Sequence, residues 1–267
     1  MPFLTANGAR LYYEERGSGP ETIVFFHSLL FNCRMFDAQI DALGGRYRCV
    51  AFDWRGHGRS EVTRDGYDMD TLTADTVALI EALDCAPCHF VGFSTGGFVG
   101  LRLGIRHPEL LRSLILVDTN ADPEPAGNLP KYRLLSLVGR WLGVGVVAGP
   151  VMSIMFSENF LSDPDRADVR RAWRQHLIDN DKVGATRAVK GVISRADVYE
   201  RLGEIRVPTL ILMGEDDVAT PPDKAKRMHA QIPDSRWVTI PKSGHMSPVE
   251  APEAVNAAIE GFLASLA

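Results

Sequence analysis

The chain has 267 residues, of which 45% are hydrophobic and 24% charged, and its formal net charge is -5. These values are typical of a globular protein with a large core. The acidic balance and the lack of a Lys/Arg run argue against a nucleic-acid-binding protein. The N-terminus lacks the pattern of a signal peptide, and no window reaches the ~20 apolar residues of a membrane span. We therefore expect a cytoplasmic protein without nucleic-acid or membrane partners.

Short apolar runs alternate with longer helical patterns along most of the chain. The predicted strands are residues 10–15 (a hairpin with the preceding residues), 22–27, 49–53, 89–93, 114–118, 207–213 and 236–240, and the predicted helices are 35–43, 72–83, 96–107 and 252–266. Continuous apolar runs such as 22–27 are typical of strands covered on both faces. This alternation predicts a parallel sheet with helices on both faces.

Between residues 120 and 201 the strand runs stop and helical patterns replace them. The predicted helices of this segment are 130–142, 146–156, 165–178 and 182–195. We predict a core domain of residues 1–119 and 202–267, with residues 120–201 inserted as a helical cap that acts as a lid. The charged run from Asp163 to Arg174 predicts a solvated helix face, and no arginine stands out as a clamp for a charged substrate.

Cys85 and Cys88 have the C-x-x-C spacing of a redox motif. A redox pair usually follows a strand, at the start of a helix that lowers the thiol pKa. Here the pair comes before an apolar run, so we interpret both as reduced loop cysteines. The second Cys or His pair that a zinc site needs is missing from the sequence pattern. We expect no metal and no cofactor.

The segment Gly92–Gly97 fits the pattern G-x-S-x-G between a predicted strand and a predicted helix, with Ser94 at the corner. A strand that turns sharply into a helix leaves space only for small residues beside the corner. The helix N-terminus places free N–H groups where negative charge would develop. The alternative is an ordinary loop with a serine cap. We predict that Ser94 is a nucleophile.

A serine nucleophile needs a base, usually a histidine that a carboxylate orients. His245 lies between the last predicted strand and the last helix, at the sheet edge where the sites of parallel sheets form. His27 and His57 also follow strands and compete for this role. For the carboxylate, residues 215–217 follow one strand and Asp118 ends another.

Several motifs together resemble the α/β-hydrolase family with a helical cap after the sixth strand. They are His27-Ser28-Leu29, the segment 53–60, Gly92–Gly97, and 214–221 followed by Gly244-His245. The resemblance implies a mostly parallel eight-stranded sheet with helices on both faces. The family pattern G-x-x-D-x-x-x-P implies Asp217 as the acid, ahead of Asp216 and Asp118. His27 and His57 then belong to turn motifs that orient loops near the site.

The resemblance also implies an oxyanion hole formed by the backbone N–H groups of Leu29 and Thr95. Ser28 replaces the glycine that is common after the histidine of this loop. His-Ser-Leu is similar to the loop of enol-lactone hydrolases, and Phe93–Gly97 is similar to the cofactor-free haloperoxidase and esterase branch.

The expected pocket wall comes from the oxyanion loop, the cap and the loops around the acid and base. Its residues are Leu30, Phe31, Trp141, Met152, Met155, Phe156, Val218 and Met246. Such a lining suits a small to medium apolar group. The alternative for each cap residue is packing within the cap, because apolar stripes at helical spacing usually form a core.

These features predict a serine hydrolase that cleaves a small-molecule carboxylic ester through an acyl-enzyme, as a monomer or homodimer. The alternatives are an enol-lactone hydrolase or a perhydrolase on the same side chains, and a ligand-binding receptor with slow turnover. A serine at the corner counts against dehalogenases and epoxide hydrolases of this fold. Those enzymes use an aspartate, because a carboxylate attacks alkyl carbon, whereas an activated serine suits carbonyl carbon.

Overall fold

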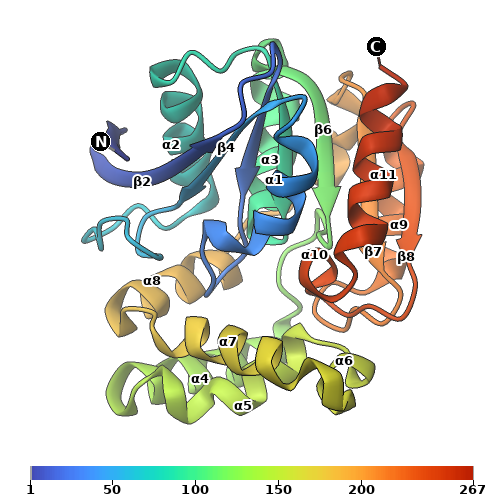
Figure 1. Cartoon of the computed structure of the whole chain (residues 1–267). Coiled ribbons are helices and arrows are strands. Elements are labelled where there is room, and N and C mark those ends of the chain that lie inside the picture. The colour runs from blue at the N-terminus through green and yellow to red at the C-terminus, as the bar shows by residue number, and fades with distance from the viewer. Residues whose placement is uncertain (1, 267) are drawn as a thin grey trace.

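The computed structural model describes residues 2–266, and within them eight strands form one sheet in the order β1-β2-β4-β3-β5-β6-β7-β8 (Figure 1). The strands are β1 (Phe3–Ala6), β2 (Ala9–Arg16), β3 (Thr22–Phe26), β4 (Arg48–Asp53), β5 (Cys88–Phe93), β6 (Leu111–Val117), β7 (Thr209–Gly214) and β8 (Arg236–Ile240). β1 and β2 pair antiparallel with their neighbours, and all pairs from β4 to β8 are parallel. The predicted fold class is confirmed.

Helices cover both faces of the sheet. One face carries α2 (Met69–Ala82), α3 (Thr95–Arg106) and α9 (Pro222–Gln231), and the other carries α1 (Asp37–Leu43) and α11 (Pro252–Ala264). Successive side chains of a strand point to opposite faces. In β3, Val24 and Phe26 therefore pack toward α2 and α3, while Ile23 and Phe25 pack toward α1 and α11. This double burial explains why the strand sequence is apolar without alternation.

The start of β6 and the helix α9 differ from the sequence-based expectation. β6 begins at Leu111, before the predicted residue 114, because Arg112 and Ser113 interrupt its apolar run although both belong to the strand. The Ser113 hydroxyl is hydrogen-bonded to Nδ1 of His89 at 2.8 Å, so this polar residue has a partner inside the sheet. The pattern of α9 was too polar to predict a helix, and only Ala225 and Met228 are buried in it.

The chain between β6 and β7 is helical, as predicted. It contains α4 (Leu129–Leu142), α5 (Val144–Met155), α6 (Glu158–Ser162), α7 (Ala167–Ile178) and α8 (Lys182–Ile193), which we call the inserted helices. Figure 1 shows them gathered at the end of the molecule toward which the arrow of β6 points. The inserted helices therefore lie over the carboxyl ends of the parallel strands, where sites of such sheets form.

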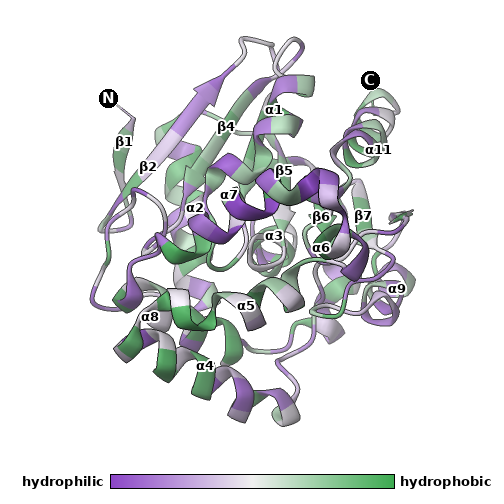
Figure 2. Cartoon of the chain, turned by 60° about the horizontal axis from the view of Figure 1, so that its bottom comes forward, coloured by the Kyte–Doolittle hydropathy of each residue, from purple (hydrophilic) through white to green (hydrophobic). Residues whose placement is uncertain are grey.

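The inserted helices differ in how they meet solvent. In Figure 2 much of α7 is hydrophilic, and no residue from Asp163 to Arg174 is buried, which confirms the predicted solvated face. On α4 and α5 several large apolar side chains are exposed: Leu134, Leu137, Trp141, Leu142 and Val146. Across residues 2–266, none of the helices combines the length and the apolar character needed to cross a membrane.

Candidate active site

Ser94 occupies the sharp turn between β5 and α3. Its φ is 51° and its ψ is -107°, a backbone conformation that is strained for a residue with a side chain. A Cβ at Gly92 would meet the carbonyl oxygen of Gly96 at 2.3 Å, and a Cβ at Gly96 would meet that of Phe26 at 2.1 Å. Both glycines are thus required by close backbone packing. This packing is the physical reason for the G-x-S-x-G spacing.

The side chains of Ser94, His245 and Asp217 form a continuous hydrogen-bonded chain. Nε2 of His245 lies 2.9 Å from Oγ of Ser94, although the two residues are 151 positions apart in the sequence. Nδ1 of the same ring lies 2.8 Å from Oδ2 of Asp217. All three side chains are buried. With Nδ1–H donating to the carboxylate, Nε2 is left as an acceptor for the Ser94 hydroxyl.

The loop after β7 holds the Asp217 carboxylate by several donors. Oδ1 accepts the backbone N–H groups of Ala219 at 2.8 Å and Thr220 at 2.9 Å. Oδ2 accepts the Thr220 hydroxyl at 2.6 Å as well as the imidazole N–H. Asp216, the competing acid, is exposed. Sequence reasoning missed Thr220. The only sequence signal that could have found it is its position three residues after Asp217.

Asp118 is the second buried carboxyl near His245, but it is hydrogen-bonded to other groups. Its Oδ1 accepts the N–H of Gly214 at 2.7 Å, and its Oδ2 accepts the N–H and the hydroxyl of Ser247. Gly214 precedes the loop of Asp217, and Ser247 follows His245. Burial, followed by the charge of Asp217, raises the pKa of Asp118 well above its ordinary value. Asp118 therefore joins the two loops that carry Asp217 and His245.

The protonation of His245 is governed by opposing effects. Burial alone would lower its pKa, because it disfavours the charged ring. The charge and hydrogen bond of Asp217, with a contribution from Asp118, outweigh burial and raise the pKa of His245 above its ordinary value. The ring is thus a stronger base than a free imidazole.

Leu29 and Thr95, the first residue of α3, line the cavity together with Ser94. Their backbone N–H groups are the donors expected from the sequence to form an oxyanion hole. Within residues 2–266 neither N–H has a hydrogen-bond partner. The first N–H groups of a helix have no partner within it, so Thr95 is free to bind an anion there.

The loop that carries Leu29 is positioned by His57. The N–H of Leu30, whose φ is 66°, donates to Nε2 of His57 at 3.0 Å. Burial lowers the pKa of His57 to about 3, so the ring is neutral and can accept this bond. His27 is also buried, and its Nδ1 is 2.7 Å from the carbonyl oxygen of Ser28. Both histidines are thus engaged by the backbone and not by Ser94.

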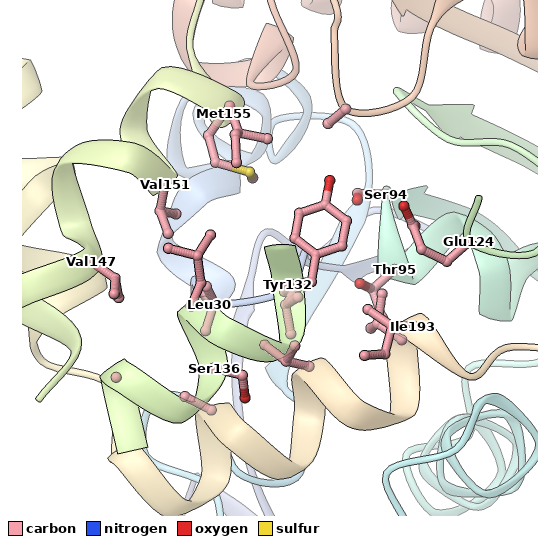
Figure 3. Close-up of a pocket in the computed structure, with 18 of the residues that line it drawn as sticks. Leu30, Ser94, Thr95, Glu124, Tyr132, Ser136, Val147, Val151, Met155 and Ile193 are labelled. Atoms are coloured by element: carbon pink, nitrogen blue, oxygen red, sulfur yellow. The ribbon is translucent and has the colours of Figure 1, made fainter. Parts of the chain in front are cut away.

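A cavity of about 150 Å³ lies between the sheet and the inserted helices, with Ser94, Thr95 and His245 on its wall. Figure 3 shows Ser94 and Thr95 beside it. An apolar cavity of about this size holds a molecule as large as benzene. Its apolar lining comes from the loop after β3 and from α4, α5 and α8: Leu29, Leu30, Leu135, Val144, Val147, Val151, Ile154, Met155, Val189, Val192 and Ile193. Leu30 and Met155 were expected on this wall.

The other residues expected to line the pocket lie elsewhere, and their assignment is corrected. Trp141 and Val218 point to solvent, with exposed fractions of 72% and 68%. The side chains of Phe31, Met152, Phe156 and Met246 are buried in the core cluster on the α1 and α11 face of the sheet, which extends to the inserted helices. There the ring of Phe31 packs edge-on against Trp173 at 5.6 Å. On α5 the cavity residues follow helical spacing through Val147 and Val151, which turns the neighbouring Met152 away.

Sequence reasoning also missed polar residues on the cavity wall. Glu124, Tyr132 and Arg195 line it together with the apolar side chains. From the sequence, we expected no arginine clamp for a charged substrate and did not place Arg195 on this wall. Arg195 is buried, but its Nη1 is paired with Oε2 of Glu124 at 3.0 Å. No local pattern could have joined these two residues, which are 71 positions apart.

The cysteines are free and buried. Cys88 is the first residue of β5, so its assignment to a loop is corrected. Burial raises the pKa of the Cys85 thiol to about 11, which is opposite to the shift of a redox-active cysteine. In the part of the chain that the structure describes, no group of three or more His, Cys, Asp or Glu could hold a metal ion.

Comparison with known proteins places this fold and site in one family. Residues 21–252 match the alpha/beta hydrolase fold family. BpoC of Mycobacterium tuberculosis, provisionally named a non-heme bromoperoxidase, is 32% identical over 96% of this chain and 98% of its own length. The structure of the enol-lactonase from Burkholderia xenovorans LB400 superposes with a TM-score of 0.91 at 27% identity, covering 98% of this chain and 100% of the lactonase. A thermophilic esterase from Thermogutta terrifontis superposes with a TM-score of 0.90 at 28% identity, covering 100% and 97%.

The chain therefore belongs to the α/β-hydrolase family. The resemblance to its enol-lactonase and haloperoxidase members, which the sequence motifs predicted, is confirmed.

Proposed function

We propose that this protein is a serine hydrolase that cleaves carboxylic esters of small, mainly apolar substrates. The observation that carries the proposal is the hydrogen-bonded chain from Ser94 through His245 to Asp217, which ends on the wall of an apolar cavity. A serine activated in this way attacks carbonyl carbon and forms an acyl-enzyme. The esterase similar in structure to this chain supports an ester as the substrate.

In the proposed reaction, Oγ of Ser94 forms a bond to the carbonyl carbon while Nε2 of His245 takes the hydroxyl proton. The N–H groups of Leu29 and Thr95 donate to the oxyanion, and donors of this kind contribute about 10²- to 10³-fold each to kcat. The bond to the alcohol then breaks, and His245 gives its proton to the leaving oxygen. Water attacks the acyl-enzyme by the same route and releases the acid.

In this proposal residues 120–201 act as a cap over the site, and residues 1–119 and 202–267 form the core. The composition of the cavity wall supports this assignment of the cap, because α4, α5 and α8 supply most of the apolar side chains that line the cavity with Ser94. Closing a site with apolar residues excludes water and strengthens the hydrogen bonds to the oxyanion. The cap would thereby set which acyl or alcohol group fits.

A lactone is the second candidate substrate, and the similarity to the enol-lactonase of Burkholderia xenovorans favours it. A lactone is a cyclic ester, so Ser94 would attack it by the same steps, and the alcohol would remain joined to the acyl group. Measuring kcat/KM for a panel of short p-nitrophenyl esters and γ- and δ-lactones ranks the two substrate classes.

The test of the nucleophile is covalent labelling with a fluorophosphonate probe, followed by peptide mapping. We expect one adduct, on Ser94, formed in parallel with the loss of ester hydrolysis, because the probe traps a serine that a histidine activates. Preincubation with a substrate ester should slow the labelling. Full activity in the labelled protein, or labelling of a different residue as activity is lost, would contradict the proposal.

The pH dependence of kcat/KM provides a separate prediction. His245 accepts the Ser94 proton only when its ring is neutral, and its raised pKa keeps the ring protonated to higher pH. Activity should therefore be lost as pH falls through the raised pKa, with the midpoint of this acid limb above pH 6.5. The measurement uses an uncharged ester, so that only the enzyme titrates. A midpoint below the ordinary value would mean that burial outweighs Asp217.

A further inference from the structure

The cavity has a polar end, formed by Glu124, Tyr132 and Arg195. Nη1 of Arg195 donates to Oε2 of Glu124 at 3.0 Å, and Nε donates to the carbonyl oxygen of Asp122 at 3.0 Å. The guanidinium group lies over the ring of Phe98, 4.3 Å from its centroid. These contacts fix the arginine side chain, which is only 3% exposed. The polar end is thus a rigid feature of the cavity wall.

Two donors of this polar end remain without a partner among residues 2–266. They are the hydroxyl of Tyr132 and Nη2 of Arg195, and both residues line the cavity. In Figure 3 the ring of Tyr132 extends from α4 into the cavity, with its hydroxyl toward the side where Ser94 and Glu124 lie. Burial, followed by the charge of Glu124, raises the pKa of Tyr132, so the phenol keeps its proton. Both groups can therefore donate to an oxygen inside the cavity.

Both carboxylate oxygens of Glu124 already accept a hydrogen bond. Oε2 of Glu124 accepts from Arg195, and Oε1 accepts from the side-chain amide of Asn128 at 2.8 Å. What the polar end offers to a ligand is thus mainly donors. Buried donors that a ligand leaves unpaired weaken its binding, so a ligand with an acceptor oxygen at this position is favoured over one with only CH₂ groups.

The charge of the polar end is balanced. Arg195 is neutralised by direct pairing with Glu124, and both groups are shielded from solvent. Lys182 also lines the cavity, but it is exposed at the start of α8, directly after Asp181. A ligand carboxylate beside Arg195 would lose its hydration and come close to the Glu124 carboxylate. An uncharged oxygen avoids both costs.

We propose that Tyr132 and Arg195 bind an uncharged carbonyl oxygen of the substrate, separate from the ester carbonyl that Ser94 attacks. The preferred substrates are then short, uncharged esters or lactones with a ketone or amide carbonyl in the chain, and carboxylate-bearing analogues bind less well. Cleavage of these substrates rests on the function proposed above, whereas their binding preference does not require turnover.

The test measures binding to the Ser94→Ala protein by NMR titration, so that no ligand is consumed. Three ligands of nearly equal size differ only at the far end of the acyl chain: ethyl pentanoate, ethyl 4-oxopentanoate and monoethyl succinate. We expect the oxo ester to bind about three- to tenfold more tightly than ethyl pentanoate. This is the gain in affinity expected from one or two hydrogen bonds to a neutral oxygen of the ligand. The succinate monoester should bind more weakly than the oxo ester.

Two variants assign the preference to the polar end. Tyr132→Phe, made in the Ser94→Ala protein, removes one of the two donors and should reduce the preference for the oxo ester over ethyl pentanoate. Tyr47→Phe is the matched control, because Tyr47 directly precedes β4, at the amino ends of the parallel strands and away from the inserted helices. This variant should keep the preference. Glu124→Gln keeps the shape but leaves Arg195 unneutralised, so the affinity for the succinate monoester should rise at least about tenfold relative to the oxo ester.

Three outcomes would overturn this inference: tightest binding of the carboxylate ester, no preference between the oxo ester and ethyl pentanoate, or an unchanged preference in Tyr132→Phe. These outcomes are independent of the proposed hydrolysis. If the wild-type protein cleaves no ester or lactone while Ser94→Ala still prefers the oxo ester, the proposed function fails and the binding preference stands.

Discussion

Replacing Ser94 with alanine is expected to lower kcat for ester hydrolysis by about 10⁵- to 10⁶-fold, the size of effect seen when a triad nucleophile is removed. The physical reason is that no other side chain can form the acyl-enzyme once Oγ is gone. The residual rate would come from the N–H groups of Leu29 and Thr95 and from the bound geometry, which need no nucleophile. Stopped assays on a short p-nitrophenyl ester, with active-site titration of the wild type, give the ratio.

The loss in Ser94→Ala should be chemical and not structural. Alanine has the same difficulty as serine with a φ of 51°, so the turn keeps its strain. The matched control is Ser243→Ala, because the Ser243 hydroxyl is buried without a partner in the described residues and its removal leaves no group unpaired. That variant should keep wild-type kcat and Tm. A Ser94→Ala protein within tenfold of wild-type kcat would rule out the serine as nucleophile.

The sequence was informative where local geometry requires particular residues. The turn around Ser94 needs Gly92 and Gly96 because backbone atoms lie close to where a Cβ would be. The two glycines therefore make this turn recognisable in the sequence. His245 could be placed beside it because residues that follow parallel strands meet at one edge of the sheet. The parallel centre of the sheet followed from continuous apolar runs, since strands such as β3, β5 and β7 are buried along their whole length. The number of eight strands came from the family resemblance.

The lining of the cavity could not be predicted, because it depends on how each inserted helix is rotated against the sheet. α5 is apolar around most of its circumference, so its sequence does not distinguish Val151, which lines the cavity, from Met152, which packs into the core. Trp141 illustrates the opposite error, since a large apolar residue was expected inside and points to solvent. These choices belong to tertiary packing, and no spacing in the sequence records them.

The polar end of the cavity was missed for a related reason. Glu124 precedes α4 and Arg195 follows α8. In the sequence, each is therefore indistinguishable from an ordinary charged residue near a helix end. Their pairing exists only because α4 and α8 pack side by side in the fold. Buried ion pairs between distant segments carry no local sequence signal, whereas the Ser94 turn does. The sequence therefore indicated the arrangement of Ser94, His245 and Asp217 better than the lining of the cavity.

Asp217→Asn should lower kcat by about 10⁴-fold while leaving the fold intact. An asparagine at this position would present an NH₂ group to Nδ1 of His245 and favour the tautomer with the proton on Nε2. That ring cannot accept the Ser94 proton, although the distance between the two side chains is kept. The loss of negative charge should also move the acid limb of kcat/KM to lower pH, because Asp217 contributes most to raising the pKa of His245.

Asp216→Asn is the matched control for this prediction, since it makes the same chemical change at an exposed neighbour. It should change kcat by less than about twofold and leave the pH profile in place, because surface charges are screened by water. Asp118→Asn is the more demanding comparison. Asp118 is buried and bonded to Gly214 and Ser247, so its replacement should lower Tm while retaining far more activity than Asp217→Asn. If Asp118→Asn or Asp216→Asn loses more activity than Asp217→Asn, the carboxylate that orients His245 is not Asp217.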